Sequence, residues 1–280
     1  MEAMTEYMDL HQVATSVAQE AAEKIVEKRR ELGDVRAYTQ TKSSPVDPVT
    51  VVDTMAEEFI VGKLQQLRPQ DGVIGEEGSD THSESGITWI VDPIDGTVNF
   101  MYGIPQYAVS IAAARDGEVI VGAVCNVATG ELYSAVKGHG ATVRRGEEVT
   151  PLKCNEVQEI GLSLIATGFG YSAKRRDAQG KLVAELLPQV RDIRRMGSAA
   201  LDLCAVASGH VDAHFEHGLN AWDYAAGALI AAEAGAVAHT PPLSSAGANG
   251  ELTLVAAAGV FDRLWELLDG IGGTPPLRVQ

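Results

Sequence analysis

The sequence predicts an α+β fold of layered helices and sheets, with a largely antiparallel sheet in the first half and a mixed sheet in the second. In the first half, the apolar runs "YAVSIAAA" and "EVIVGAVC" flank Arg-Asp-Gly, which is typical of a β-hairpin, and further runs extend it to an antiparallel meander of about four strands. In the second half, strand-like and helix-like segments alternate. No linker composition divides residues 1–280, so we expect a single domain with an N-terminal half at about residues 9–150 and a C-terminal half at about residues 151–270.

Helical periodicity and turn residues place the elements before the meander. Apolar residues at helical spacing predict an amphipathic helix over residues 9–32. The polar residues 34–50 predict an exposed loop or a loose hairpin. A second helix is expected from about residue 54 to residue 67, because Thr54 and Glu57 form a capping-box pattern. Its apolar stripe comprises Phe59, Ile60, Leu64 and Leu67.

The segments of the second half follow from the same signals. Strands are expected at residues 160–168, 211–216, 236–240 and 252–259. Helices are expected at residues 174–187, 198–209, 222–235 and 260–268.

Composition and charge exclude several classes of function. The net charge is −16, from 38 acidic and 22 basic residues, which argues against nucleic acid or an anionic membrane as the main partner. A small phosphate ligand stays compatible with this charge if metal cations reverse the local field. No apolar run reaches the ~18 residues of a membrane span, the N-terminus lacks signal-peptide features, and the three widely spaced cysteines fit no zinc or disulfide pattern. We therefore expect a cytoplasmic protein.

The stretch "WIVDPIDGTVNF", residues 89–100, carries the strongest chemical signal. Its apolar run ends in Asp92 and Asp95, and two carboxylates so close in a partly dry place cannot both stay ionised without a cation. Hard oxygen ligands of this kind suit Mg²⁺, Mn²⁺ or Ca²⁺. Gly96 and Thr97 follow with backbone N–H groups at a predicted helix start, an arrangement that receives phosphate well. The stretch predicts a divalent metal beside an anion-binding turn, with a purely structural acidic turn as the alternative.

Three other acidic groups have structural explanations of their own. Asp47 and Asp53 lie at a boundary between a loop and a helix, where N-capping competes with any functional role. Glu76 and Glu77 alone would be a solvated loop. Asp223 falls in the first turn of a predicted helix, where the dipole favours an acid.

Five segments together resemble the inositol monophosphatase family of Mg²⁺-dependent, lithium-sensitive phosphatases. They are "KSSPVDPVTVVD" (42–53), "GEEG" (75–78), "WIVDPIDGTVNF" (89–100), "GSAALDLCAVASGHVDAHFE" (197–216) and "WDYAAG" (222–227). The first three segments and the last occur in the order and at the spacing of the family, the segment at 197–216 is also similar to a family segment, and the resemblance covers about residues 10–270. It implies the layered α/β/α/β/α sugar-phosphatase fold.

The resemblance also implies roles for individual residues, and this sequence matches the family pattern at each. A first metal would be bound by Glu76, Asp92 and the Ile94 carbonyl, and a second by Asp92, Asp95 and Asp223. Glu77 and Thr97 would orient and activate the attacking water. The substrate would be held by Asp95, Gly96, Thr97, Ser198, Ala199 and Glu216, with Lys42 and Asp53 as accessory candidates.

The implied activity is phosphate-monoester hydrolysis with two or three Mg²⁺ ions and direct attack by water, without a covalent phospho-enzyme. Myo-inositol 1-phosphate is the expected substrate, and a homodimer is the expected assembly. The alternatives are a histidinol-phosphate or fructose-1,6-bisphosphate phosphatase and a non-catalytic metal-binding regulatory protein. Glu216, expected to accept a substrate hydroxyl, has a surface acid at a strand end as its alternative. Residues 167–176 are expected to close over the site, with Lys174, Arg175 and Arg176 either steering phosphate or lying solvated.

Overall fold

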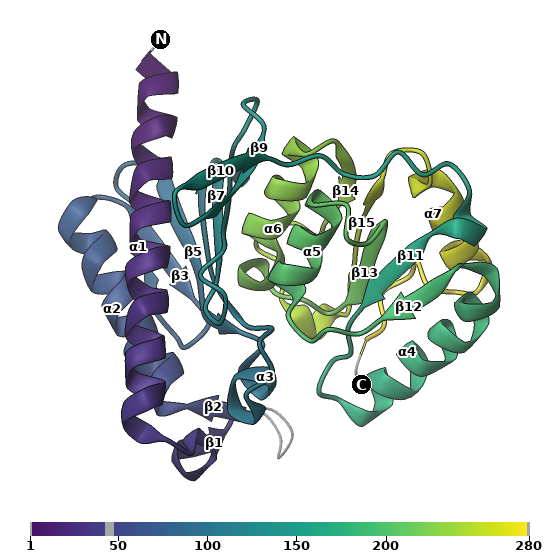
Figure 1. The fold of residues 1–280 in the computed structure, drawn as a ribbon, viewed down its shortest axis with the longest axis horizontal. Helices are drawn as coiled ribbons and strands as arrows, with labels where there is room; N and C mark the ends of the chain where they lie inside the picture. Colours follow the sequence, from purple (N-terminus) through teal and green to yellow (C-terminus); the bar gives the residue numbers. More distant parts are fainter. Residues whose placement is uncertain (1, 43–47, 279–280) are drawn as a thin grey trace.

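The fold is seen in a computed structural model that describes residues 2–42 and 48–278 (Figure 1). Asp47, an N-capping candidate, lies outside these residues. None of the described helices combines the length and apolar character that crossing a bilayer requires.

An eight-stranded sheet forms the first half, in the order β10-β9-β8-β7-β6-β5-β3-β4. All neighbours in it are antiparallel except β3 and β5, so the predicted meander is confirmed. The strands are β3 (Gly72–Gly75), β4 (Asp80–Thr81), β5 (Ile87–Asp95), β6 (Ala108–Arg115), β7 (Glu118–Asn126), β8 (Leu132–Val136), β9 (Ala141–Arg145) and β10 (Glu148–Pro151).

A five-stranded mixed sheet forms the second half, in the order β12-β11-β13-β15-β14. Strand β11 is parallel to both its neighbours, whereas β15 is antiparallel to both of its own. The mixed character is as predicted, although the short edge strand β12 was not expected. The strands are β11 (Leu164–Thr167), β12 (Asp192–Arg194), β13 (Ala213–His217), β14 (Ala236–His239) and β15 (Leu252–Ala257).

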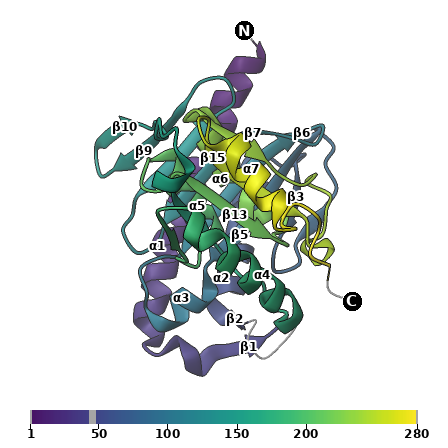
Figure 2. The same ribbon diagram turned by 90° about the vertical axis from the view of Figure 1, so that its right-hand side faces the viewer.

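Helices and sheets alternate in five layers, α/β/α/β/α (Figure 1). Helices α1 (Glu2–Leu32) and α2 (Val51–Leu67) cover the outer face of the first sheet, and α5 (Ala199–Ala207) and α6 (Ala221–Glu233) lie between the sheets. Helices α4 (Ala173–Leu186) and α7 (Phe261–Gly270) cover the outer face of the second sheet (Figure 2). The apolar cluster between the sheets contains Ile90 and Val124 from the first sheet and Val255 from the second, so one core unites both halves.

The second helix begins three residues earlier than predicted. Thr50 is its N-cap: the Thr50 hydroxyl accepts a hydrogen bond from the Val52 N–H (3.1 Å), and the Asp53 carboxylate accepts one from the Thr50 N–H (2.9 Å). The predicted cap at Thr54 and Glu57 is wrong. Thr50 and Thr54 each precede an acid by three residues, and the earlier pair, Thr50 with Asp53, forms the cap.

Two further features of this region complete the fold. Leu67 is exposed and does not continue the apolar stripe. A 3₁₀ turn (Val35–Tyr38) leads into β1 (Thr39–Thr41), which pairs antiparallel with β2 (Pro48–Thr50), as a loose hairpin requires. Other 3₁₀ turns are Ile160–Leu162, Leu187–Gln189 and Gly247–Asn249.

Substitution of Gly122 should test the packing of the first sheet against the middle layer. A Cβ atom there would lie 2.8 Å from the Ala226 carbonyl oxygen on α6, too close for either backbone to accommodate. We expect Gly122→Ala to lower the free energy of unfolding by about 1–3 kcal/mol in urea titrations. Gly180→Ala is the matched control, since nothing lies within 4 Å of its Cβ position in α4, and it should stabilise by about 0.5–1 kcal/mol. Equal effects of the two substitutions would contradict this packing argument.

Candidate active site

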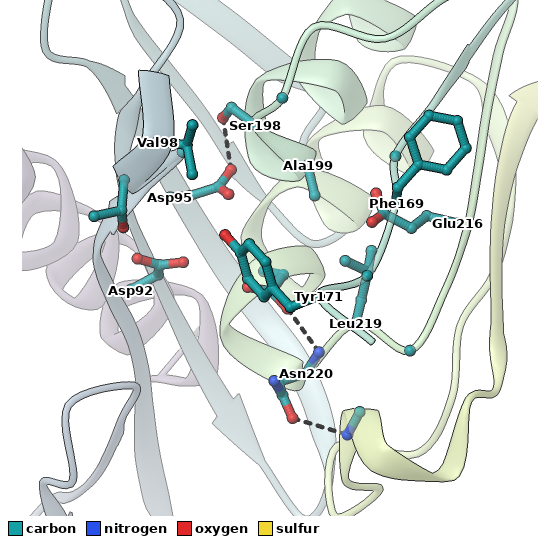
Figure 3. Close-up of a pocket in the computed structure, with 18 of the residues that line it drawn as sticks. Asp92, Asp95, Val98, Phe169, Tyr171, Ser198, Ala199, Glu216, Leu219 and Asn220 are labelled. Carbon is teal, nitrogen blue, oxygen red and sulfur yellow. Dashed lines mark hydrogen bonds between the residues drawn. The ribbon is translucent and has the colours of Figure 1, made fainter. Parts of the chain in front are cut away.

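A cavity of about 540 Å³ opens where the two sheets and the middle helices meet (Figure 3). Its walls come from the end of β5, from α3 (Thr97–Tyr102), from the starts of α5 and α6, from β13 and from the segment before α4. The predicted site residues that line it are Lys42, Glu76, Asp92, Ile94, Asp95, Gly96, Thr97, Ser198, Ala199, Glu216 and Asp223.

Asp92 and Asp95 lie at the end of β5 and point into the cavity (Figure 3). The strand register shifts between them, and this irregularity lets both side chains face the same side although they are three residues apart. Asp92 accepts a hydrogen bond from the Ile94 N–H (2.9 Å). Asp95 accepts from the Ser198 hydroxyl (2.6 Å) and from the Ala200 N–H (2.7 Å) at the start of α5.

Asp223 completes an acidic triad with Asp92 and Asp95. It is part of the capping box of α6, where its carboxylate accepts from the Asn220 N–H (2.7 Å). One oxygen from each of the three carboxylates lies within 4.8 Å of the others. Asp223 can therefore serve both as a helix-capping residue and as a member of the site, because capping directs its carboxylate toward those of Asp92 and Asp95.

Burial destabilises the ionised form of the three carboxylates in this triad. Burial and the neighbouring Glu76 carboxylate raise the pKa values of Asp92 and Asp223 well above the ordinary range. Burial also raises the pKa of Asp95 to about 6, although the Ser198 and Ala200 hydrogen bonds oppose the shift. The ion pairs between described residues give these three acids no positive partner. Two buried carboxylates and one partly buried carboxylate without a positive partner fit a divalent cation.

Glu76 and Glu77 form the turn after β3 and share one lysine. The Lys42 ammonium lies 2.8 Å from a Glu76 carboxylate oxygen and 2.5 Å from a Glu77 carboxylate oxygen. Burial raises the pKa of Glu77 to about 7 despite this lysine. Burial alone would lower the pKa of Lys42, but Glu76 and Glu77 raise it overall. The two glutamates are only partly exposed, so they are not a solvated loop.

The position of this turn is set by Glu57, which sequence reasoning assigned to a helix cap. The Glu57 carboxylate on α2 accepts from the Glu77 N–H (2.7 Å) and from the Ser79 N–H (3.0 Å). Gly75 permits this approach, because a Cβ there would lie 2.6 Å from the same carboxylate. In the sequence, Glu57 precedes Ile60 by three residues and Leu64 by seven, so it falls on the apolar face of the predicted helix. This unusual place for an acid was the available signal.

Gly96 and Thr97 form the turn between β5 and α3. Gly96 has φ +94°, and a Cβ there would meet the Gln106 carbonyl oxygen at 2.9 Å, so the position requires glycine. The Thr97 hydroxyl lies 3.0 Å from an Asp53 carboxylate oxygen and 3.1 Å from the Ile94 carbonyl oxygen, to either of which it donates. Asp53 therefore has both a capping role and a contact with the site, and burial raises its pKa to about 6.

Ser198 lies beside Asp95 and Ala199 follows it at the start of α5, whereas Glu216 lies across the cavity beside Phe169 (Figure 3). The Ser198 hydroxyl caps α5 by accepting from the Leu201 N–H (3.3 Å) while donating to Asp95. Glu216 on β13 is 9% exposed, which rules out a surface acid. Burial raises the pKa of Glu216 to about 8, opposed by the positive charge of Arg195.

The segment before α4 contributes aromatic rings to the cavity. Phe169 and Tyr171 both line it (Figure 3). Arg175 is buried and donates to the Leu277 carbonyl (3.0 Å) and the Ala248 carbonyl (2.9 Å), which ties this segment to the C-terminal part of the chain. The expectation of a solvated helix start is thus wrong for Arg175.

Sequence reasoning missed three titratable residues in and beside the cavity wall: Asp202, His214 and Arg195. Asp202 is an acid inside an otherwise apolar helix, and His214 precedes Glu216 by two residues on the same face of a strand. Both patterns are visible in the sequence and could have marked these residues.

The sequence and the fold of this chain are similar to those of known proteins. The model of the inositol monophosphatase family matches residues 6–270. The chain belongs to the inositol monophosphatase family. It is 48% identical over 283 residues to "Inositol-1-monophosphatase SuhB" of Mycobacterium tuberculosis, covering 96% of each chain. The solved structure of Mycobacterium tuberculosis SuhB has a TM-score of 0.82 and 45% identity, covering 95% of this chain and 98% of that one. The chain is also 41% identical over 201 residues to "Nus factor SuhB" of Haemophilus influenzae, covering 71% of this chain and 74% of that protein.

Membership of the inositol monophosphatase family makes this chain a phosphatase that acts on a phosphorylated small molecule. The family is metal-dependent, and the acidic triad is a cluster of carboxylates that could hold a metal ion.

The acidic triad should make the stability of the metal-free protein depend on pH. The pKa of Asp95 is 3.8 ordinarily and about 6 in the fold, so its stabilising contribution is full below about 3.8 and falls as pH rises through 6. This group alone accounts for a loss on the order of 3 kcal/mol. We expect Mg²⁺ to raise the melting temperature by several degrees at about pH 7.5 and much less at about pH 5, where protons occupy the carboxylates.

Thermal denaturation followed by circular dichroism measures both effects. Asp92→Asn should lose most of the increase at pH 7.5, whereas Asp177→Asn, an exposed acid on α4, should keep it. An equal rise in melting temperature on addition of Mg²⁺ at both pH values would contradict the assignment of the ion to the triad.

Proposed function

We propose that this chain hydrolyses myo-inositol 1-phosphate to inositol and inorganic phosphate in a Mg²⁺-dependent reaction. The observation that carries the proposal is the acidic triad of Asp92, Asp95 and Asp223, which lies across one cavity from the hydrogen-bond acceptor Glu216. The triad suits the phosphate end of the substrate through a bound cation, and Glu216 suits a hydroxyl at the polyol end. The names of the mycobacterial relatives agree with this substrate.

Two or three Mg²⁺ ions are the proposed cofactor. Their protein ligands would be Glu76, Asp92, the Ile94 carbonyl, Asp95 and Asp223. When bound, the ions supply positive charge that neutralises the phosphate and favours attack by water. Lys42 is proposed as an accessory residue, because it balances the charge of Glu76 and Glu77 in the structure described here.

Glu77 and Thr97 are proposed to orient the attacking water. With its pKa raised to about 7, the Glu77 carboxylate can take a proton from water near neutral pH. The Thr97 hydroxyl, while donating to Asp53, can accept from the same water. A water oxygen then bonds to phosphorus as the bond to the inositol oxygen breaks, and that oxygen takes up a proton. No side chain in this arrangement forms a bond to phosphorus.

The rest of the site is proposed to hold the substrate. Backbone N–H groups of Gly96 and Thr97 suit the phosphate oxygens, as the first N–H groups of a helix do. Glu216 would accept a hydrogen bond from an inositol hydroxyl, beside Ala199. Ser198 contributes by fixing Asp95, because its hydroxyl already donates to that carboxylate.

Other phosphate monoesters define the alternatives. Histidinol phosphate and fructose 1,6-bisphosphate also offer a hydroxyl or a polar group at the far end, so they are the competing substrates. A non-catalytic regulatory role is the candidate from another class, and the relative named "Nus factor SuhB" is the observation in its favour. We further propose a homodimer and a cytoplasmic location, which the three free, buried cysteines fit.

Phosphate release from a panel of the three substrates, with Mg²⁺ and with or without lithium, tests the function. We expect the highest kcat/KM with myo-inositol 1-phosphate and inhibition by lithium. Turnover of another substrate at a higher kcat/KM would replace the substrate assignment, and no turnover of any would favour the regulatory role.

Replacing the ligands tests the metal site. Asp92→Asn and Asp95→Asn should each lower kcat/KM at least about 100-fold at ordinary Mg²⁺, because loss of a charged ligand weakens both binding and charge stabilisation. Asp177→Asn should keep wild-type kinetics. Substantial activity in both site variants, with circular dichroism unchanged, would refute the assignment.

A further inference from the structure

Behind Glu216 the cavity wall contains a buried group of three titratable side chains, Asp202 on α5 and His214 and Glu216 on β13. Asp202 is 1% exposed and His214 is fully buried. His214 lies between the two acids: its Nδ1 is 3.7 Å from Asp202 Oδ2, and its Nε2 is 3.8 Å from Glu216 Oε2. The imidazole therefore connects an acid of the middle helix layer to the acid that faces the cavity.

Three polar atoms of this group have no hydrogen-bond partner within residues 2–42 and 48–278. Both His214 nitrogens and Asp202 Oδ1 are buried without a hydrogen bond among the described residues. The two gaps exceed the roughly 3.2 Å limit of an N–H···O hydrogen bond. They are also too short for a bridging water, which needs roughly 4.5 Å between its two partners. Because buried polar groups are nearly always paired, small side-chain rotations that close both gaps directly are the simplest resolution.

The surroundings decide the direction of the two hydrogen bonds. Burial lowers the pKa of His214 to about 3, so the imidazole is neutral and has one donor and one acceptor nitrogen. Burial raises the pKa of Glu216 to about 8, Arg195 opposes this shift, and a hydrogen bond donated by His214 would lower the pKa and favour the ionised form. For Asp202 the strongest charged neighbour is Glu216 itself, which raises the Asp202 pKa further and keeps this acid protonated.

We propose that Asp202, His214 and Glu216 form a hydrogen-bonded relay that positions Glu216 for the polyol end of the substrate. Protonated Asp202 donates to His214 Nδ1, and His214 Nε2–H donates to Glu216 Oε2. The other Glu216 oxygen is then oriented to accept from a substrate hydroxyl. This inference rests on the proposed function for the identity of that hydroxyl, and it makes His214 a positioning residue that never contacts the phosphate.

His217 offers a matched control on the same strand. It is equally buried, but side chains alternate along β13, so it faces away from Glu216 and its Nε2 contacts the Gly273 carbonyl oxygen at 2.8 Å. A substitution at His217 disturbs the packing of the same strand without touching the relay.

Steady-state kinetics with two substrates test the positioning role. His214→Phe should raise KM for myo-inositol 1-phosphate about 5- to 10-fold, the scale of one hydrogen bond, with kcat changed less than about 2-fold. It should leave KM for p-nitrophenyl phosphate, which has no hydroxyl to bind, unchanged. His214→Gln, which keeps a donor, should recover part of the loss. His217→Phe should not change the ratio of the two KM values, and an equal KM increase for both substrates in His214→Phe would overturn the relay.

The tautomer of His214 provides a readout independent of catalysis. In ¹⁵N-histidine-labelled, metal-free protein, the imidazole signal that disappears in His214→Gln should be that of the neutral Nε2–H form at about pH 7. An Nδ1–H or doubly protonated imidazole would overturn the proposal. If wild-type protein fails to hydrolyse myo-inositol 1-phosphate while the Nε2–H form is observed, the proposed substrate is wrong and the hydrogen-bond direction stands.

Discussion

Crowding of negative charge in a largely buried site is the constraint on which this structure depends. Asp92, Asp95 and Asp223 are held within 4.8 Å of one another, and burial opposes the ionised form of each. Each carboxylate accepts at least one backbone N–H, which offsets part of that cost and fixes its direction. The register shift in β5, the start of α5 and the capping box of α6 all serve to supply these N–H groups.

The acidic triad could be predicted from the sequence because its members lie at places with strong local signals. Asp92 and Asp95 end an apolar run, and Asp223 is in the first turn of a helix. Glu216 was harder, since only the family resemblance distinguished it from a surface acid. Asp202 and His214 each stand out in the sequence, but their contact joins a helix to a strand, and such tertiary proximity has no signal within a single segment.

The parts of the fold that were predicted correctly are those with clear local signals in the sequence. Hairpins joined by short turns are local, so β6 to β9 were recovered with their pairing. The predicted start of α2 was wrong because two adjacent Thr-x-x-acid patterns, residues 50–53 and 54–57, are equivalent in the sequence. Tertiary contact chose between them: Glu57 holds the turn at Glu77 and is not available as a cap. The edge strand β12 has three residues and no distinctive pattern of its own.

The bond between Asp95 and the start of α5 has a consequence for how this enzyme can change during evolution. Asp95 ends a strand of the first sheet, whereas Ser198 and Ala200 belong to the helix layer that carries the second. The Asp95 carboxylate is thus a candidate metal ligand, and its hydrogen bonds also join the two halves of the molecule. A substitution at Asp95 is therefore expected to change the chemistry of the site and the alignment of the two halves together. New substrate ranges would more readily arise from the segment before α4, whose Phe169 and Tyr171 line the cavity.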